Sequence, residues 1–156
     1  MIRYTISFER LCAIMPEWKW LELEIGLKKS IITAQDIKGY ALQILTEYID
    51  KYDLVLELAV AKEDEVCQIL ERLCFPVEQQ DESVLNKWIF AIIYYVYIYD
   101  RGRVFEIIED VYVEFDYLKQ LQNLISYMPC EDGKTIEERL EAYILDGERK
   151  YIKRNN

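Results

Sequence analysis

Histidine is missing from the sequence, and glycine and proline are scarce, with five and three residues among 156. Without histidine the chain lacks the commonest general acid–base group and the commonest metal ligand, and it cannot form a Ser–His–Asp triad. The glycines are scattered, which excludes a glycine-rich phosphate-binding loop. Because turns favour glycine and proline, their scarcity also predicts few turns and long secondary-structure elements.

The four cysteines, Cys12, Cys67, Cys74 and Cys130, are an even number, which raises the alternative of disulfides. The spacing of Cys67 and Cys74 is too long for a CxxC metal or redox motif. The N-terminal residues show no basic segment followed by an apolar run, so we expect no export signal. A chain of this length also buries enough surface to fold without disulfides. We therefore expect free, mostly buried thiols in a reducing cytoplasm, with no metal and no cofactor.

Acidic residues outnumber basic ones by 29 to 19, which gives a net charge of −10. A chain of this charge repels the phosphate backbone, so we expect no nucleic-acid partner. The same charge attracts a basic protein by long-range steering. The alternative is that the acidic balance serves only solubility.

Twelve consecutive uncharged residues, four of them tyrosines, run from Trp88 to Tyr99. They suit a membrane anchor, a buried core element or an exposed binding surface. A helix of twelve residues is about 18 Å long, short of a hydrocarbon core of about 30 Å, so we expect no membrane contact. The uninterrupted pattern over residues 83–100 is too long for a typical strand. We predict a central buried helix there, ended by Gly102.

Apolar residues at helical spacing predict helices along the rest of the chain as well. The expected elements are residues 4–15, a helix with Pro16 in its first turn, a helix capped by Thr33, residues 53–74 as one helix or as two broken near Lys62, 104–117, 118–128, and a last helix capped by Thr135 with Glu138 and ended or bent at Gly147. The predicted fold is a single all-α domain over residues 1–156. It is a bundle of roughly six to eight helices built from antiparallel helix hairpins.

Acidic residues and tyrosines gather in one segment of the predicted helix over 104–117. This acidic strip consists of Glu109, Asp110, Tyr112, Glu114, Asp116 and Tyr117. Carboxylates steer a basic partner, and tyrosines supply rigid contact area, so we predict that the strip binds a protein. The alternative is that the tyrosines pack into the bundle while the acids face water.

Two further pairs of acids have helical spacing, Glu106 with Asp110 and Glu138 with Glu141. Paired carboxylates can serve as general acid and base, but on exposed helix faces they are ordinary solvated surface. A carboxylate di-metal site would need Glu-x-x-His motifs, which this chain cannot supply. We therefore predict no catalytic residues.

Three stretches resemble a bacterial family catalogued as a domain of unknown function. They are the tryptophan-rich residues 18–37, the aromatic and acidic residues 111–117, and residues 125–129. The family's acidic motif is expected to continue with proline, whereas this chain has Leu118, which indicates a different turn. The resemblance implies a small, helical, acidic, cytoplasmic protein. Because some such families serve as immunity partners of bacterial toxins, it also implies an immunity role.

The sequence thus predicts a non-enzymatic cytoplasmic binding protein, an immunity protein that neutralises a basic toxin domain through its acidic surface. One alternative is a helical scaffold or regulatory subunit that acts by self-association as a homo-oligomer. The other is a carboxylate-based enzyme, which would need converging acids in a pocket and at least one raised pKa.

Overall fold

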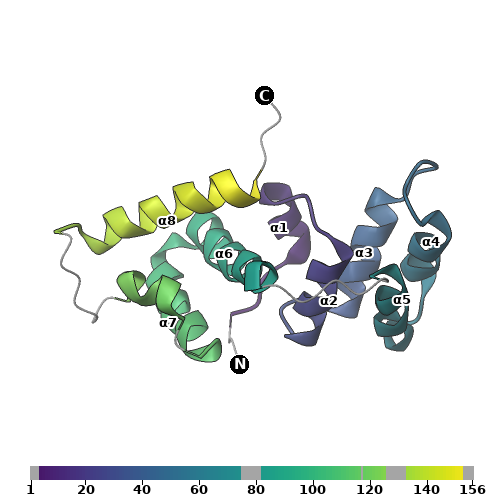
Figure 1. Ribbon diagram of the computed structural model, residues 1–156, viewed down its shortest axis with the longest axis horizontal. Coiled ribbons are helices and arrows are strands. Elements are labelled where there is room, and N and C mark those ends of the chain that lie inside the picture. The colour runs from purple at the N-terminus through teal and green to yellow at the C-terminus, as the bar shows by residue number, and fades with distance from the viewer. Residues whose placement is uncertain (1–3, 75–81, 117, 126–132, 153–156) are drawn as a thin grey trace. The chain divides into compact units, whose positions relative to one another are not determined.

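The computed structural model describes residues 4–74, 82–116, 118–125 and 133–152, and all regular structure within them is helical (Figure 1). The predicted all-α class is confirmed. In order along the described chain the α-helices are α1 (Phe8–Ile14), α2 (Trp20–Lys28), α3 (Ala34–Ile44), α4 (Tyr52–Val60), α5 (Val66–Leu73), α6 (Glu82–Tyr99), α7 (Val104–Glu114) and α8 (Ile136–Tyr151). Three short 3-10 helices accompany them: η1 (Glu63–Glu65), η2 (Arg101–Arg103) and η3 (Lys119–Leu124).

The chain divides into two compact units. One unit holds residues 7–88, and the other holds residues 1–6 together with 89–156, so the division falls inside α6. Each unit is described by itself below. The single domain over residues 1–156 stays a prediction.

In the unit of residues 7–88, α3, α4 and α5 pack on one another and α2 packs on α5 (Figure 1). Of the two alternatives for residues 53–74, the break near Lys62 is confirmed, because α4 ends at Val60 and η1 follows Lys62. Thr33 caps α3 as predicted, since its hydroxyl accepts a hydrogen bond from the Asp36 amide at 3.2 Å. The place predicted for Pro16 is wrong.

Helix α2 begins at Trp20, beyond Pro16, because Lys19 is its N-cap residue and Glu22 completes a capping box with it. The Lys19 amide donates a hydrogen bond to the Glu22 carboxylate at 2.8 Å, which satisfies a backbone donor that the helix leaves unpaired.

Aromatic rings form the core of this unit. Trp18 stacks on Trp88 with 4.4 Å between ring centroids, and the ring of Phe8 packs against both. The indole N–H of Trp88 donates to the Glu22 backbone carbonyl at 2.6 Å. This bond places the indole so close to Gly26 that a Cβ there would lie 2.5 Å from the ring. Glycine is therefore required at Gly26 for the close approach of helix and ring.

Helix α6 confirms the predicted helix over residues 83–100 and its burial, since the residues from Trp88 to Val96 are all buried. None of the helices in the described part of the chain is long and apolar enough to cross a membrane. The role predicted for Gly102 is wrong. The helix ends at Tyr99, and Gly102 lies within η2, where nothing requires a left-handed glycine.

In the unit of residues 1–6 and 89–156, the role predicted for Gly147 is wrong as well. Helix α8 continues past it to Tyr151, so Gly147 does not end the helix. Gly147 is buried, and the ring of Phe90 occupies the space that a Cβ would need. A glycine is needed at this position because the Phe90 ring packs closely against the helix, and not because the helix ends there.

The helix predicted over residues 118–128 is 3-10 rather than α in its described part. Leu121 and Leu124, which are both buried, lie three residues apart, the spacing that a 3-10 helix places on one face. This segment packs against α7 and α8. Residues 126–132 lie outside the described residues.

The cysteines are free where they are described, as predicted, but the expectation that they are mostly buried is wrong for Cys67. Cys12 and Cys74 are half-buried, while Cys67 is exposed because it lies beside the buried face of α5 rather than on it. Cys130 lies outside the described residues.

Candidate functional site

The acidic strip predicted from the sequence lies on α7 and the residues just after it. Glu114 and Asp116 are exposed, and Glu109 and Asp110 are half-buried. Tyr112 is only 3% exposed, so its ring belongs to the core. For Tyr112 the alternative prediction is therefore the correct one: the ring packs inward, while the neighbouring acids face water. Tyr117 lies outside the described residues.

Helix α7 has one buried and one exposed side because its apolar residues recur at helical spacing. Its buried residues are Val104, Ile107, Ile108, Val111 and Tyr112, which lie three or four residues apart along the helix. The acids take the positions that remain, and from Val104 to Asp116 there is no basic residue. The strip therefore presents carboxylates beside one apolar side chain, Val113, which is 53% exposed.

Of the other acid pairs weighed from the sequence, Glu106, Glu138 and Glu141 are exposed and Asp110 is half-buried. Glu106 makes an exposed ion pair with Arg103, with 3.1 Å between the atoms. The hydrogen bond from the Arg103 guanidinium lowers the pKa of the Glu106 carboxyl, which is opposite to the shift that a general acid needs. Glu138 and Glu141 are both exposed on α8. Across the described residues, no three His, Cys, Asp or Glu side chains are grouped so that they could hold a metal ion.

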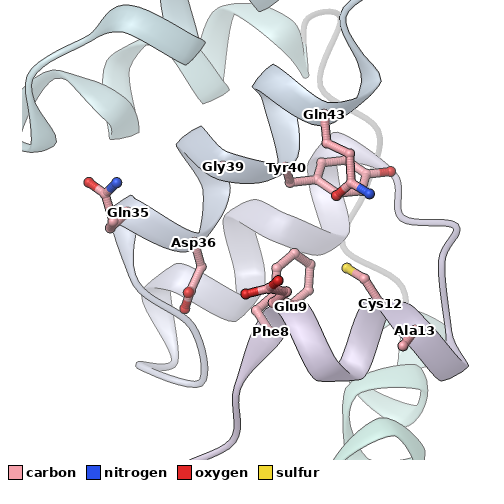
Figure 2. Close-up of a pocket in the computed structure, with 9 residues that line it drawn as sticks. All are labelled: Phe8, Glu9, Cys12, Ala13, Gln35, Asp36, Gly39, Tyr40 and Gln43. Atoms are coloured by element: carbon pink, nitrogen blue, oxygen red, sulfur yellow. The ribbon is translucent and has the colours of Figure 1, made fainter.

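A cavity of about 510 Å³ lies between α1 and α3, inside the unit of residues 7–88 (Figure 2). This α1–α3 cavity was not predicted from the sequence. Its lining consists of Phe8, Glu9, Cys12, Ala13, Gln35, Asp36, Gly39, Tyr40 and Gln43.

Two of the lining residues of the cavity are small. Ala13 lies on α1 and Gly39 on α3, and neither fills the space between the helices. A Cβ at Gly39 would have no neighbouring atom within 4 Å, in contrast to Gly26 and Gly147. Nothing in the packing therefore requires a glycine at this position, and its effect is to leave the cavity open.

Carboxylates give the cavity its electrostatic character. Figure 2 shows the Glu9 and Asp36 carboxylates on the same side of it, one from each helix. One oxygen of Asp36 accepts the Thr33 amide at 3.0 Å, which fixes this carboxylate at the start of α3. The side chains of Gln35 and Gln43 add amide groups, and none of the nine lining residues is basic. The lining thus favours a positively charged occupant.

The thiol of Cys12 points into the cavity (Figure 2). Burial, with a smaller contribution from the charge of Asp36, raises the pKa of this thiol to about 11. A thiol with this pKa is almost wholly protonated at neutral pH, and the thiolate is the nucleophilic form. The cavity therefore does not activate Cys12 for covalent catalysis.

Tyr40 closes the inner side of the cavity and is held there by the backbone. Its hydroxyl donates to the Trp18 carbonyl at 3.2 Å and accepts from the Trp18 amide at 3.3 Å. Burial raises the pKa of this hydroxyl, so it is neutral at physiological pH. These bonds make Tyr40 a fixed wall rather than a proton-transfer group.

The sequence contained a weak signal for this cavity. Phe8, Cys12 and Tyr40 belong to the apolar stripes that predicted helices over this region. Ala13 follows Cys12 directly, and Gly39 lies beside Tyr40 within the predicted helix. Small residues next to two such stripes indicate space between helices, but only the structure shows that the two positions line one cavity.

The family is now evident from direct comparison. The model of the family DUF2247, described as an uncharacterised protein conserved in bacteria, matches residues 9–156. The chain belongs to this family. The predicted resemblance to a bacterial domain of unknown function is thereby confirmed, and the family match includes both the α1–α3 cavity from Glu9 onward and the acidic strip. No curated protein and no solved structure matches the chain significantly.

Proposed function

We propose that this chain is a non-enzymatic, cytoplasmic binding protein whose partner is a basic protein. The specific form of the proposal is an immunity protein that neutralises a basic bacterial toxin domain. The observation that carries it is the surface of α7, where Glu114 and Asp116 are exposed, Glu109 and Asp110 are half-buried, and no basic residue interrupts the series.

Electrostatics explains how such a surface would act. With a net charge of −10, the whole chain attracts a basic protein over a distance of several ångströms before contact. The carboxylates of α7 then supply local complementarity, which sets orientation and association rate more than it sets final affinity. Val113, exposed between these acids, adds apolar contact area.

The side-chain chemistry supports a binding role over a catalytic one. The chain has no histidine. The Cys12 thiol, which lines the α1–α3 cavity, has a pKa of about 11 because it is half-buried beside Asp36, so it is a poor nucleophile at neutral pH.

The test compares two charge-reversed variants in a tagged capture from the native bacterial host at low and high salt. The first reverses the four acids of α7, Glu109, Asp110, Glu114 and Asp116, to lysine. The control reverses four exposed acids of the other unit, Glu63, Asp64, Glu65 and Glu71, so that both variants have the same net charge.

We expect the unaltered chain and the control to capture the same basic protein at low salt and to lose it as salt rises. The α7 variant should fail to capture it even at low salt. Equal capture by the two variants would contradict the role given to α7, and capture of no basic protein at all would contradict the proposal.

A second candidate, self-association as a scaffold, is favoured by one observation. Tyr52, Leu56 and Val60 are 39%, 39% and 73% exposed and lie four residues apart on α4, so they form an apolar stripe. Under this candidate, analytical ultracentrifugation should show a dimer or larger assembly that Leu56→Glu converts to a monomer. A monomeric unaltered chain at micromolar concentrations would dispose of it.

A further inference from the structure

We propose that the α1–α3 cavity binds an organic cation with a guanidinium or ammonium group, held between the carboxylates of Glu9 and Asp36. The site lies in the unit of residues 7–88, whereas the acidic strip of the proposed function lies on α7 in the other unit. The inference therefore goes beyond that function and stands or falls separately.

Charge is the first argument. Glu22, a buried acid of the same unit, shows how this chain neutralises a carboxylate with one of its own bases. The ammonium of Lys87 lies 2.8 Å from the Glu22 carboxylate, and both side chains are largely buried. The α1–α3 cavity brings together two carboxylates from different helices, and no base is among its nine lining residues. A cation supplied from outside would be attracted by both carboxylates.

Size and lining select the kind of cation. A volume of about 510 Å³ is that of a small-molecule site and far larger than a metal ion needs. Calcium binds six to eight oxygen atoms, and the described residues form no group that could hold a metal ion. Phe8 and Tyr40 give an aromatic inner wall that suits the alkyl part of an amine or the plane of a guanidinium.

The polar groups match the donors of such a cation. A guanidinium has five N–H donors and an ammonium has three, and both need only acceptors. The lining supplies such acceptors: the carboxylates of Glu9 and Asp36 and the amide oxygens of Gln35 and Gln43. The oxygen of Asp36 that bonds the Thr33 amide fixes the carboxylate without consuming the whole group.

The cysteines provide a built-in assay. Cys12 lines the cavity, whereas the exposed Cys67 is outside it and serves as the internal control. The full-length chain is treated with N-ethylmaleimide at mildly alkaline pH, and each labelled cysteine is quantified by peptide mass spectrometry. The probe is N-acetylarginine methylamide, and the neutral control is N-acetylnorleucine methylamide.

We expect the arginine probe at about ten times its Kd to slow the labelling of Cys12 about tenfold, because only the unoccupied site reacts. Labelling of Cys67 should not change. The neutral analogue should protect Cys12 far less. A peptide of three Arg-Gly-Ser repeats is tested as a second cationic probe. The proposal would be overturned if the arginine probe and its neutral analogue protected Cys12 equally. It would also be overturned if neither the arginine probe nor the peptide protected Cys12.

Two variants test the geometry. Glu9→Gln removes one exposed carboxylate without touching the cap of α1, and it should weaken protection of Cys12. Gly39→Met, whose Cβ meets no neighbouring atom, should fold and should abolish protection by filling the cavity. Glu63→Gln, on the exposed η1, is the matched control and should keep full protection. Protection of Glu9→Gln and Gly39→Met equal to that of the unaltered chain would contradict the site.

The source of the cation is distinguished in the same assay. Protection by the free arginine probe assigns the cavity to a small organic cation, while protection by the Arg-Gly-Ser peptide alone assigns it to a basic side chain of a protein. The lysine-reversed α7 variant should retain protection in either case. If the α7 variant fails to capture the partner, that result bears only on the proposed function. If the cavity variants lose protection of Cys12, that result bears only on the cavity.

Discussion

Two faces of the unit of residues 7–88 differ in whether a base lies beside their carboxylates. Where α2 meets the beginning of α6, the Glu22 carboxylate has the Lys87 ammonium at 2.8 Å, and the ring of Trp88 packs on Gly26. Between α1 and α3, two carboxylates line a cavity that contains no base, and Gly39 opens onto empty space. The first face neutralises its carboxylate with its own base, and the second is the face to which we assign an organic cation.

The same amino-acid types therefore carry different information at the two faces. Lys87 also donates to the Glu17 carbonyl at 2.9 Å and lies over the Trp18 ring, so its ammonium has several partners. Such fully satisfied burial is structural. A glycine beneath a ring is likewise a packing requirement, whereas a glycine facing a cavity is a means of keeping it open.

Removal of Lys87 should have the largest effect on stability. Lys87→Met leaves the Glu22 carboxylate buried without its cation, and we expect a loss of about 3–5 kcal/mol in the free energy of unfolding, measured by urea denaturation. The matched control is Arg72→Met, whose pair with Glu57 is exposed and should cost about 0–1 kcal/mol. Equal costs for the two variants would contradict the contrast.

The glycines give the next largest effect, with opposite signs. Gly26→Ala forces a Cβ against the Trp88 ring, which the indole hydrogen bond holds in place, and should destabilise the chain by about 1–3 kcal/mol. The indicator is the shift of the urea midpoint at unchanged slope. If Gly26→Ala were neutral or stabilising, the Trp88 ring would have to move aside at little cost, and the predicted loss of stability would be wrong.

Gly39→Ala should change stability in the opposite direction to Gly26→Ala. Because its Cβ meets nothing within 4 Å and alanine is the better helix former, we expect stabilisation by about 0.5–1 kcal/mol in the same denaturation experiment. Destabilisation would mean that the space beside Gly39 is filled.

The smallest effect concerns the pH dependence of Cys12. Burial and Asp36 raise the pKa of the thiol to about 11, so its rate of alkylation should rise about tenfold per pH unit through the mildly alkaline range before levelling near that pKa. Asp36→Asn removes the smaller of the two causes and should lower the pKa modestly. A rate that levels below pH 9 in the unaltered chain would contradict the described burial.

Periodicity predicted most of the helices, because helices such as α3, α5 and α7 bury an apolar stripe. It predicted α6 to within one residue at each end, and Thr33 and Thr135 were correctly assigned as caps because a short hydroxyl side chain before an acid has a local role. The glycines were misjudged for a physical reason. A glycine that ends a helix and one that admits an aromatic ring look alike until the partner ring is known, as Phe90 shows for Gly147.

The candidate sites show the same limit. The acids of α7 are close together in sequence, so their grouping was predictable, although the burial of Tyr112 depends on tertiary packing. Glu9 and Asp36 come from different helices, and nothing local in the sequence shows that they share a cavity. Sites built across helices require the packing itself.

The most direct test of the contrast between the two faces is an NMR titration of the uniformly ¹⁵N-labelled chain with N-acetylarginine methylamide. We expect saturable shifts of the amides of Cys12, Asp36 and Gly39, with no change at Glu22 or at the Trp88 indole N–H. Shifts that grow without saturation at acidic residues throughout the chain, or no shifts in the cavity, would contradict it.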